Sequence, residues 1–209
     1  MSAAVPCMQQ QVTRTAGEGD AEAVIGAING RRSIREYEKR DLAEETVRRL
    51  IDAGVQAPTG LGFQPWRFVV VRDRDLMREV SEYCKKTLTA ELAGVDDEST
   101  QRFLSLLKQE GFNIFYNAPV LVLVFGAADD PMSSLDCTLC AENMMLAAWS
   151  LGVGSCWIGS ASVVARNSDL MERLQAPEGY NLVAPLIFGY PAAMPEKPER
   201  RDPVITRVG

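Results

Sequence analysis

The run Val-Leu-Val-Leu-Val-Phe at residues 120–125 is apolar at every position, and it decides the fold of this chain. Continuous apolar runs of this length are typical of a β-strand that is covered on both faces. A long helix is predicted after it, over residues 133–151, because Ser133 or Ser134 can cap its start and Gly152 follows its end. That helix is apolar nearly all round, so we expect it to lie at the centre of the fold.

Further helices and strands flank this central pair in the sequence. Helices are predicted over residues 21–28, 41–55, 76–93 and 100–115, and strands over residues 66–72, 155–158 and 183–188. Asp41 is the expected N-cap of the second helix, with Glu44 three residues later. The mixture predicts an α+β or α/β sandwich. With 209 residues, we expect a flexible arm over residues 1–20 and a single domain over residues 21–209.

Composition argues against several classes of partner. The formal net charge of −6 and the pI near 4.9 disfavour nucleic acid or an anionic membrane as the main partner. Residues 1–20 are polar and lack the apolar centre of a signal peptide. The longest apolar run, residues 119–128, is too short to span a membrane. The sequence therefore predicts a cytoplasmic protein.

The chain has no histidine and five cysteines. The lack of histidine excludes Ser-His and Cys-His catalysis and every His-ligated metal site, so chemistry must come from another group or from a cofactor. An odd number of cysteines predicts free thiols. Cys137 and Cys140 have the spacing of a redox pair, but they lie one turn apart in an apolar helix. We interpret them as buried hydrophobic side chains, and we expect no metal site.

The segment Arg-Arg-Ser-Ile-Arg at residues 31–35 concentrates positive charge in an acidic protein. In an extended chain, Arg31, Ser33 and Arg35 lie on one side, and Ile34 points the other way, toward a core. Two guanidinium groups with a hydroxyl between them match the oxygen atoms of a phosphate. The alternative is a solvated basic surface beside the end of a helix.

Three other segments are candidates for a ligand site. Residues 57–66 join a helix to a strand and contain two prolines and two glycines, which suit close approach of a flat ligand. Residues 152–160 form a strand that ends in small residues. Residues 189–191 lead into a proline-rich tail that carries further cations. The alternatives are an ordinary loop, a buried strand with a glycine turn, and a solvated terminus.

In this order and spacing, the four segments resemble the nitroreductase family of flavoproteins, from about residue 24 to the C-terminus. The resemblance implies an α+β fold, a nitroreductase-like α/β/α sandwich with a central mixed, mostly antiparallel sheet flanked by helices. It also implies a homodimer with an exchanged C-terminal tail, and FMN bound at the dimer interface. The tail ends in Val204, Ile205 and Val208, which fits packing on a second subunit.

The resemblance also assigns residues to the cofactor. The FMN phosphate and ring edge are expected to be held by Arg31, Arg32, Ser33 and Arg35. Residues 58–60 are expected to approach the flavin from the partner subunit, and residues 157–159 to line the ring. Arg200 or Arg201 is expected to close on the phosphate. The full cofactor set is Arg31, Arg32, Ser33, Arg35, Pro58, Thr59, Gly60, Gln64, Trp157, Ile158, Gly159, Arg200 and Arg201, and the substrate pocket is Leu61, Gly62 and Phe63.

The implied function is an FMN-dependent oxidoreductase that uses NAD(P)H to reduce small electron-poor acceptors, such as nitroaromatics or quinones, by ping-pong hydride transfer. No catalytic side chain is expected, because the chemistry takes place at flavin N5. Gly62 stands where the family often has asparagine, and Thr59 where serine is commoner. These departures leave open a reductive dehalogenase, an oxidase of peptide-like substrates, or a flavin-binding module with little turnover.

Overall fold

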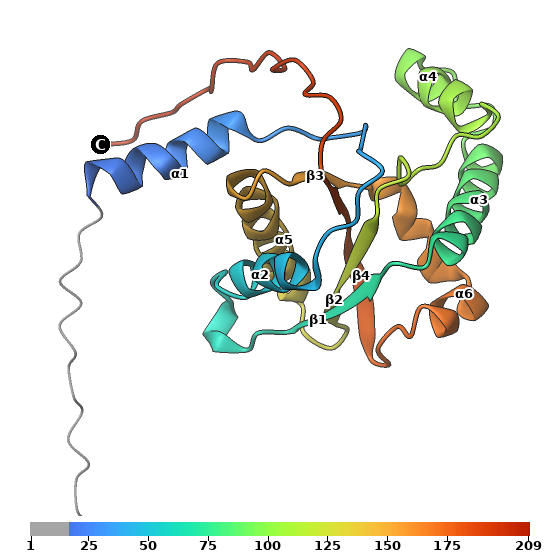
Figure 1. Ribbon diagram of the computed structural model, residues 1–209, viewed down its shortest axis with the longest axis horizontal. Coiled ribbons are helices and arrows are strands. Elements are labelled where there is room, and N and C mark those ends of the chain that lie inside the picture. Colours follow the sequence, from blue (N-terminus) through green and yellow to red (C-terminus); the bar gives the residue numbers. More distant parts are fainter. Residues whose placement is uncertain (1–16) are drawn as a thin grey trace, which may run out of the picture.

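The centre of the molecule is a four-stranded antiparallel sheet. A computed structural model describes residues 17–209. The strands are β1 (Trp66–Val71), β2 (Val120–Ala127), β3 (Gly154–Trp157) and β4 (Tyr180–Gly189), in the spatial order β1-β2-β4-β3 (Figure 1). One parallel bridge joins Ser33 to Ser155 and makes the pairing mixed. The predicted fold class, an α+β sandwich with a mostly antiparallel sheet, is confirmed.

Strand β2 is buried on both faces, as its uninterrupted apolar sequence predicts. Its side chains alternate between two separate hydrophobic clusters. Leu121, Leu123 and Phe125 pack in one cluster, and Val120, Val122 and Val124 pack in the other. A strand that must be apolar on both sides holds the middle of a three-layer sandwich.

One face of the sheet is covered by helices α2 (Glu44–Gly54) and α5 (Ser133–Ser150). The two helices approach each other closely at Gly54, where an added Cβ would lie 2.7 Å from Met144 Cγ. Cys137 and Cys140 are fully buried here as free thiols, which confirms their interpretation as core side chains. Burial raises the pKa of Cys137 to about 11 and that of Cys140 to about 12.

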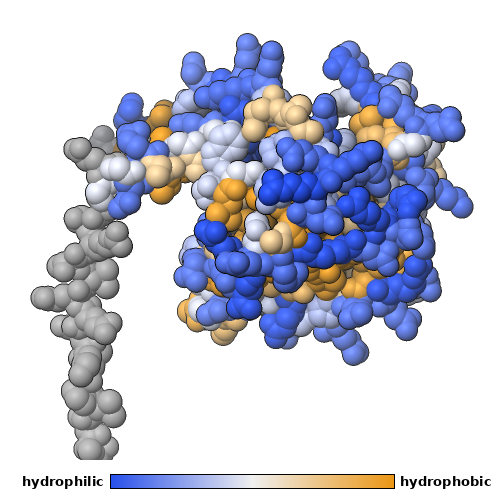
Figure 2. Space-filling view, viewed as in Figure 1, coloured by the Kyte–Doolittle hydropathy of each residue, from blue (hydrophilic) through white to orange (hydrophobic). Residues whose placement is uncertain are grey.

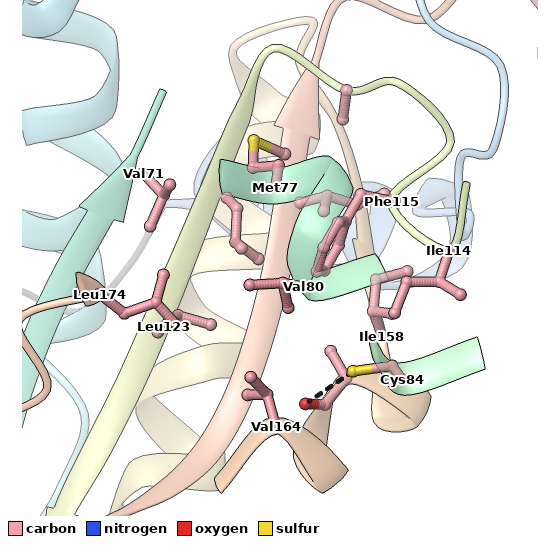
Figure 3. Packing of buried hydrophobic residues seen from close by; sticks show 14 of the residues in the cluster. Val71, Met77, Val80, Cys84, Ile114, Phe115, Leu123, Ile158, Val164 and Leu174 are labelled. Carbon is pink, nitrogen blue, oxygen red and sulfur yellow. Dashed lines mark hydrogen bonds between the residues drawn. The ribbon is translucent and has the colours of Figure 1, made fainter. Parts of the chain in front are cut away.

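The opposite face is covered by α3 (Arg74–Glu91), α6 (Ser168–Arg173) and the 3₁₀ segment η2 (Gly159–Arg166). Figure 3 shows this cluster, to which α3 contributes Met77 and Val80, β2 contributes Leu123 and η2 contributes Val164. The Cys84 thiol lies 3.9 Å from the Ala161 carbonyl oxygen. Helix α4 (Glu98–Leu107) stands at the edge of this layer (Figure 1).

Helix α1 (Glu18–Gly30) and the segment after Gly189 extend from the body of the molecule and lie on the same side of it (Figure 1). Val24, Ile25 and Ile28 of α1 are more than half exposed, and apolar side chains reach the surface there (Figure 2). Val204 and Val208 near the C-terminus are almost fully exposed. Most of the arm predicted over residues 1–20 lies outside the described residues.

The predicted end of one helix and the predicted N-cap of another are wrong. The helix expected over residues 100–115 ends at Leu107, because the chain takes up left-handed backbone conformations at Gly111 and again at residues 116 and 117. Asp41 is not an N-cap, since α2 begins at Glu44 and the Asp41 carboxylate pairs with Arg74 at 2.9 Å. The Asp41 carboxylate therefore contacts an arginine of the helix Arg74–Glu91 and not the N-terminus of α2.

Helix α5 begins at Ser133 as predicted, but neither Ser133 nor Ser134 is its N-cap. Met132 occupies the N-cap position, and no side chain caps it. The Ser133 hydroxyl instead donates a hydrogen bond to the Ala127 carbonyl at 2.7 Å, which ties the helix to the end of β2. In residues 17–209, no helix combines the length and apolar composition that crossing a membrane requires.

Candidate functional site

Residues 31–35 run as an extended segment beside the edge strand β3. The Ile34 N–H donates to the Ser155 carbonyl at 2.9 Å, and the Ile34 side chain is 1% exposed. Gly154 allows this close approach, because an added Cβ would lie 2.8 Å from Ile34 Cγ1. The prediction that Ile34 enters the core is confirmed, and its burial fixes the neighbouring Ser33 and Arg35 at the sheet edge.

The polar side of this segment lines a cavity of about 340 Å³, here called the basic cavity. The C-terminal tail crosses it and supplies its other wall. The lining residues are Arg31, Arg32, Ser33, Arg35, Pro195, Glu196, Pro198 and Arg200. Four guanidinium groups and one hydroxyl face one carboxylate in this set, so the cavity has an excess of positive charge. Arg201 is not among its lining residues.

The four arginines have different partners. Arg31 Nε contacts Glu142 of α5 at 3.2 Å. Arg32 Nη1 donates to the carbonyls of Asn29, Gly30 and Arg31 at 2.8–2.9 Å, so it caps the C-terminus of α1. Arg35 and Arg200 are both exposed, which leaves them accessible to a ligand.

A second cavity, of about 380 Å³, adjoins the first through Arg35, which lines both; it is here called the aromatic cavity. Helix α4, the loop after it, and the end of β3 form its walls. The lining residues are Arg35, Phe103, Leu106, Phe112, Ile114, Tyr116, Cys156, Trp157, Ile158, Gly159 and Ser160. Arg35 is the single charged residue in this set.

The titratable groups around Arg35 are held in their neutral forms. Burial raises the pKa of Tyr116, and the Arg35 guanidinium opposes this only in part. Burial likewise raises the pKa of Tyr37, whose hydroxyl donates to the Ile34 carbonyl at 2.8 Å. Burial also raises the pKa of the Cys156 thiol against the opposing effect of Arg35. Near neutral pH, Arg35 therefore carries the charge of this region.

The loop at residues 58–64 lies away from both cavities within one protomer. It forms a short 3₁₀ turn, η1 (Gly60–Gly62), and the Gly60 N–H donates to the buried Asp136 carboxylate at 3.1 Å. Leu61 is 91% exposed and Phe63 is 66% exposed. The backbone is left-handed at Leu61, although a leucine favours other conformations.

The structure thus brings together part of the predicted set. Residues 31, 32, 33, 35 and 200 share the basic cavity with the tail, and residues 157–159 share the aromatic cavity with Arg35. The other predicted residues line neither the basic nor the aromatic cavity of their own protomer; they are Pro58, Thr59, Gly60, Leu61, Gly62, Phe63, Gln64 and Arg201. Phe63 and Gln64 line a different cavity, together with Arg67 and Tyr180.

Sequence reasoning did not find the aromatic wall formed by Phe103, Leu106, Phe112 and Tyr116. Three of these residues, Phe103, Leu106 and Phe112, fall in the segment predicted as one helix over residues 100–115, in which they would form an ordinary apolar stripe, and Tyr116 follows that segment directly. Their common position depends on the break after Leu107, and no local signal marks it as part of a site.

Known proteins resemble this chain over most of its length. A sequence model described as the nitroreductase family matches residues 28–190. An Archaeoglobus fulgidus protein with the provisional name NADH dehydrogenase/NAD(P)H nitroreductase is 30% identical over 177 residues, 81% of this chain and 86% of that protein. Iodotyrosine deiodinase of Nematostella vectensis is 26% identical over 180 residues, 82% of this chain and 68% of that protein.

Solved structures share the fold. A nitroreductase from Bacteroides fragilis, described with bound FMN, superposes with a TM-score of 0.75 at 27% identity, covering 89% of this chain and 98% of that one. An iodotyrosine deiodinase bound to FMN and 3-iodo-L-tyrosine gives a TM-score of 0.75 at 23% identity, covering 88% of this chain and 97% of that one, which reflects the fold alone.

Proposed function

This chain belongs to the nitroreductase family, which confirms the family prediction, and we propose that it is an FMN-dependent NAD(P)H oxidoreductase. In this proposal the FMN phosphate lies in the basic cavity, and the flavin ring lies along residues 157–159 in the aromatic cavity. When bound, FMN supplies the redox chemistry by accepting a hydride from NAD(P)H and passing reducing equivalents to an acceptor. The chain itself supplies binding, orientation and charge.

The observation that carries this proposal is the position of Arg35 at the junction of the two cavities. FMN has a dianionic phosphate at one end and a flat aromatic ring at the other, and the two adjoining cavities match these two ends. Guanidinium groups bind phosphate through paired, charge-assisted hydrogen bonds, and a serine hydroxyl adds another donor. The residues present therefore fit the cofactor.

Individual roles follow from the partners of each arginine. We assign Arg31, Ser33, Arg35 and Arg200 to the phosphate. Arg200 is preferred over Arg201 because Arg200 lines the basic cavity. Arg32 acts mainly on the protein, since its guanidinium caps α1 and fixes the start of the cationic segment.

We further propose that the site is completed by a second copy of the chain. Leu61 and Phe63 of the loop at residues 58–64 are exposed, and the loop lines neither the basic nor the aromatic cavity of its own protomer, which supports a role at a partner's cofactor. In this arrangement Pro58, Thr59, Gly60 and Gln64 approach the partner's flavin, and Leu61, Gly62 and Phe63 border the acceptor pocket. The exposed apolar residues of α1 and of the tail then become interface residues.

The proposed dimer with an exchanged C-terminal tail can be tested separately from the cofactor. An exchanged tail predicts an interface of roughly 2,000–5,000 Å² and a dimer that persists at nanomolar concentration. Sedimentation of the full chain is compared with that of a chain lacking residues 203–209, in which Val204, Ile205 and Val208 are absent. We expect the deletion to weaken dimerisation and FMN retention together. A monomeric full chain that holds FMN stoichiometrically contradicts the arrangement.

The aromatic cavity favours small, flat, uncharged acceptors such as nitroaromatics or quinones. Its lining is mainly aromatic and aliphatic, and its small polar side chains, apart from Arg35, are the Cys156 thiol and the Ser160 hydroxyl. A halogenated amino acid would place its ammonium group there without a carboxylate among the lining residues, and an unpaired buried charge is costly. Reductive dehalogenation is therefore the second candidate, supported by the similarity to iodotyrosine deiodinase.

The decisive experiment is an anaerobic titration of the FMN-loaded protein with NADH or NADPH, followed by addition of p-benzoquinone, nitrobenzene or 3-iodotyrosine. We expect the flavin absorbance to bleach and then to return with the quinone or the nitro compound. Return with 3-iodotyrosine alone would identify a dehalogenase. A flavin that stays oxidised would indicate a binding module, and absence of FMN uptake would contradict the site. The predicted cytoplasmic location stays a prediction.

A further inference from the structure

The loop between α4 and β2 holds Tyr116 in a backbone conformation that its side chain does not favour. Tyr116 has φ of 51° and Asn117 has φ of 55°, two consecutive non-glycine residues in the left-handed region. Each such residue costs on the order of 1 kcal/mol relative to a right-handed conformation. Strain of this kind persists where surrounding contacts fix it, and it is concentrated at functional sites.

Hydrogen bonds within the loop impose this conformation. The Tyr116 N–H donates to the Asn113 carbonyl at 2.8 Å, and the Phe115 N–H donates to the Asn113 side-chain oxygen at 2.8 Å. The Ala118 N–H donates to the Phe115 carbonyl at 2.9 Å. These hydrogen bonds therefore fix the backbone both before and after Tyr116.

Contacts with α3 and the core anchor the same loop from outside. The Ile114 N–H donates to the buried Ser81 hydroxyl at 3.1 Å, and Lys85 Nζ donates to the Phe112 carbonyl at 2.8 Å. Ile114 and Phe115 are at most 2% exposed, and Figure 3 shows both in the hydrophobic cluster. Core packing thus holds the two residues before Tyr116, while Tyr116 itself remains half-buried at the aromatic cavity.

Tyr116 is the one tyrosine among the lining residues of the aromatic cavity. Its ring meets Phe112 edge to face, with centroids 5.6 Å apart, and the Arg35 guanidinium carbon lies 5.9 Å from its centroid. The nearby Tyr37 uses its hydroxyl on the Ile34 carbonyl and does not line the cavity. These contacts fix the Tyr116 ring from two sides at the wall of the proposed acceptor pocket.

We propose that Tyr116 is a specificity-determining residue whose phenol donates a hydrogen bond to an oxygen atom of the acceptor. This inference rests on the proposed function, since it concerns the pocket in which the acceptor is reduced. The phenol is neutral at working pH, because the ordinary pKa of tyrosine, about 10, lies above that range, and burial raises the pKa of Tyr116 further. It transfers no proton. It selects acceptors that carry a carbonyl, quinone or nitro oxygen, and it orients them against the flavin.

The test removes the hydroxyl alone, with Tyr116→Phe, and compares it with Tyr83→Phe, the same change on α3 at a residue that does not line the cavity. The first readout is equilibrium binding to the FMN-loaded protein, measured from the perturbation of the flavin spectrum. Acetophenone carries a carbonyl oxygen, and ethylbenzene is a matched ligand without one. We expect Tyr116→Phe to weaken acetophenone binding about 3- to 10-fold, the size of one neutral hydrogen bond, and to leave ethylbenzene unchanged.

The second readout separates the two halves of turnover by stopped-flow absorbance. Reduction by dithionite and reoxidation by ferrocenium, which has no hydrogen-bond acceptor, should match the wild type. Reoxidation by p-benzoquinone should slow about 3- to 10-fold in Tyr116→Phe and not in Tyr83→Phe. Equal effects on both members of a ligand pair, altered FMN affinity, or no effect would overturn the role of Tyr116. A wild-type protein that takes up no FMN would instead refute the proposed function.

Discussion

Replacement of Arg35 by alanine tests the proposed cofactor site most directly, because Arg35 lines both the basic and the aromatic cavity. Its side chain is exposed in the protomer, and its guanidinium carbon lies 5.9 Å from the centre of the Tyr116 ring. An exposed cation–π contact contributes about 0.5–1 kcal/mol. The free energy of unfolding of the FMN-free variant should therefore fall by no more than about 1 kcal/mol.

The effect on FMN should be much larger. A hydrogen bond between a guanidinium and a phosphate contributes about 1.5–3 kcal/mol, which corresponds to a factor of roughly 10 to 150 in the dissociation constant. The loss in FMN binding free energy should thus exceed the loss in the free energy of unfolding. This difference distinguishes a residue that contacts the ligand from one that only stabilises the fold. Arg35→Lys should recover part of the affinity, because it keeps the charge and loses the paired geometry.

The assay is a fluorescence titration of FMN, whose emission changes on binding, with chemical denaturation of the FMN-free proteins in parallel. Arg48→Ala serves as the matched control, since Arg48 is an exposed arginine of α2 that pairs with Asp52 and lines neither cavity. Its FMN affinity should equal that of the wild type. An unchanged dissociation constant in Arg35→Ala would refute the placement of the cofactor.

Three further predictions concern the framework of the site. Asp136→Ala removes the carboxylate that accepts a hydrogen bond from the Gly60 N–H at 3.1 Å. The free energy of unfolding, measured by urea denaturation, should fall by about 1–3 kcal/mol. An unchanged denaturation midpoint would count against this anchor of the loop. Gly154→Ala adds a Cβ within 3.0 Å of the Ile34 side chain, so it should lower the free energy of unfolding by about 1–3 kcal/mol and weaken FMN binding. Gly159→Ala is the control, because nothing lies within 4 Å of its added Cβ, and its stability should stay near that of the wild type. Burial raises the pKa of Cys84 to about 12, above its ordinary value, so the folded state keeps a proton that the unfolded state releases. Stability should accordingly fall as the pH rises from about 9 toward 12, and peptide mapping after treatment with a thiol reagent at pH 8 should find Cys84 unmodified unless the protein is unfolded; modification of the native thiol would contradict its burial.

Several features of the fold were predictable because their causes are local. The uninterrupted apolar run at residues 120–125 dictates a strand with two buried faces, and the structure places it between two clusters. The extended segment at residues 31–35 alternates its side chains by backbone geometry, so the burial of Ile34 followed from the sequence. The order of the four candidate segments was likewise enough to indicate the family.

Features that depend on contacts between distant residues were not predictable. The break after Leu107 needs the anchoring of residues 112–118 on α3, and so the position of Tyr116 in the aromatic cavity is a product of packing. Asp41 satisfies the local rule for a cap, yet an arginine 33 residues away takes its carboxylate. Local propensity gives way where a tertiary partner offers a comparable free energy.

The sequence by itself determined the strands and the main helices, the cationic segment beside an edge strand, and the family of the chain, because periodicity and residue chemistry act over a few residues. Tertiary structure alone decided that Arg200 and not Arg201 faces the basic cavity, that Arg35 joins this cavity to an aromatic one, and that the loop at residues 58–64 lies apart from both. These outcomes depend on the path of the C-terminal tail across the edge of the sheet and on the path of the chain after α4. Such paths are set by the sum of many weak contacts between residues far apart in the chain.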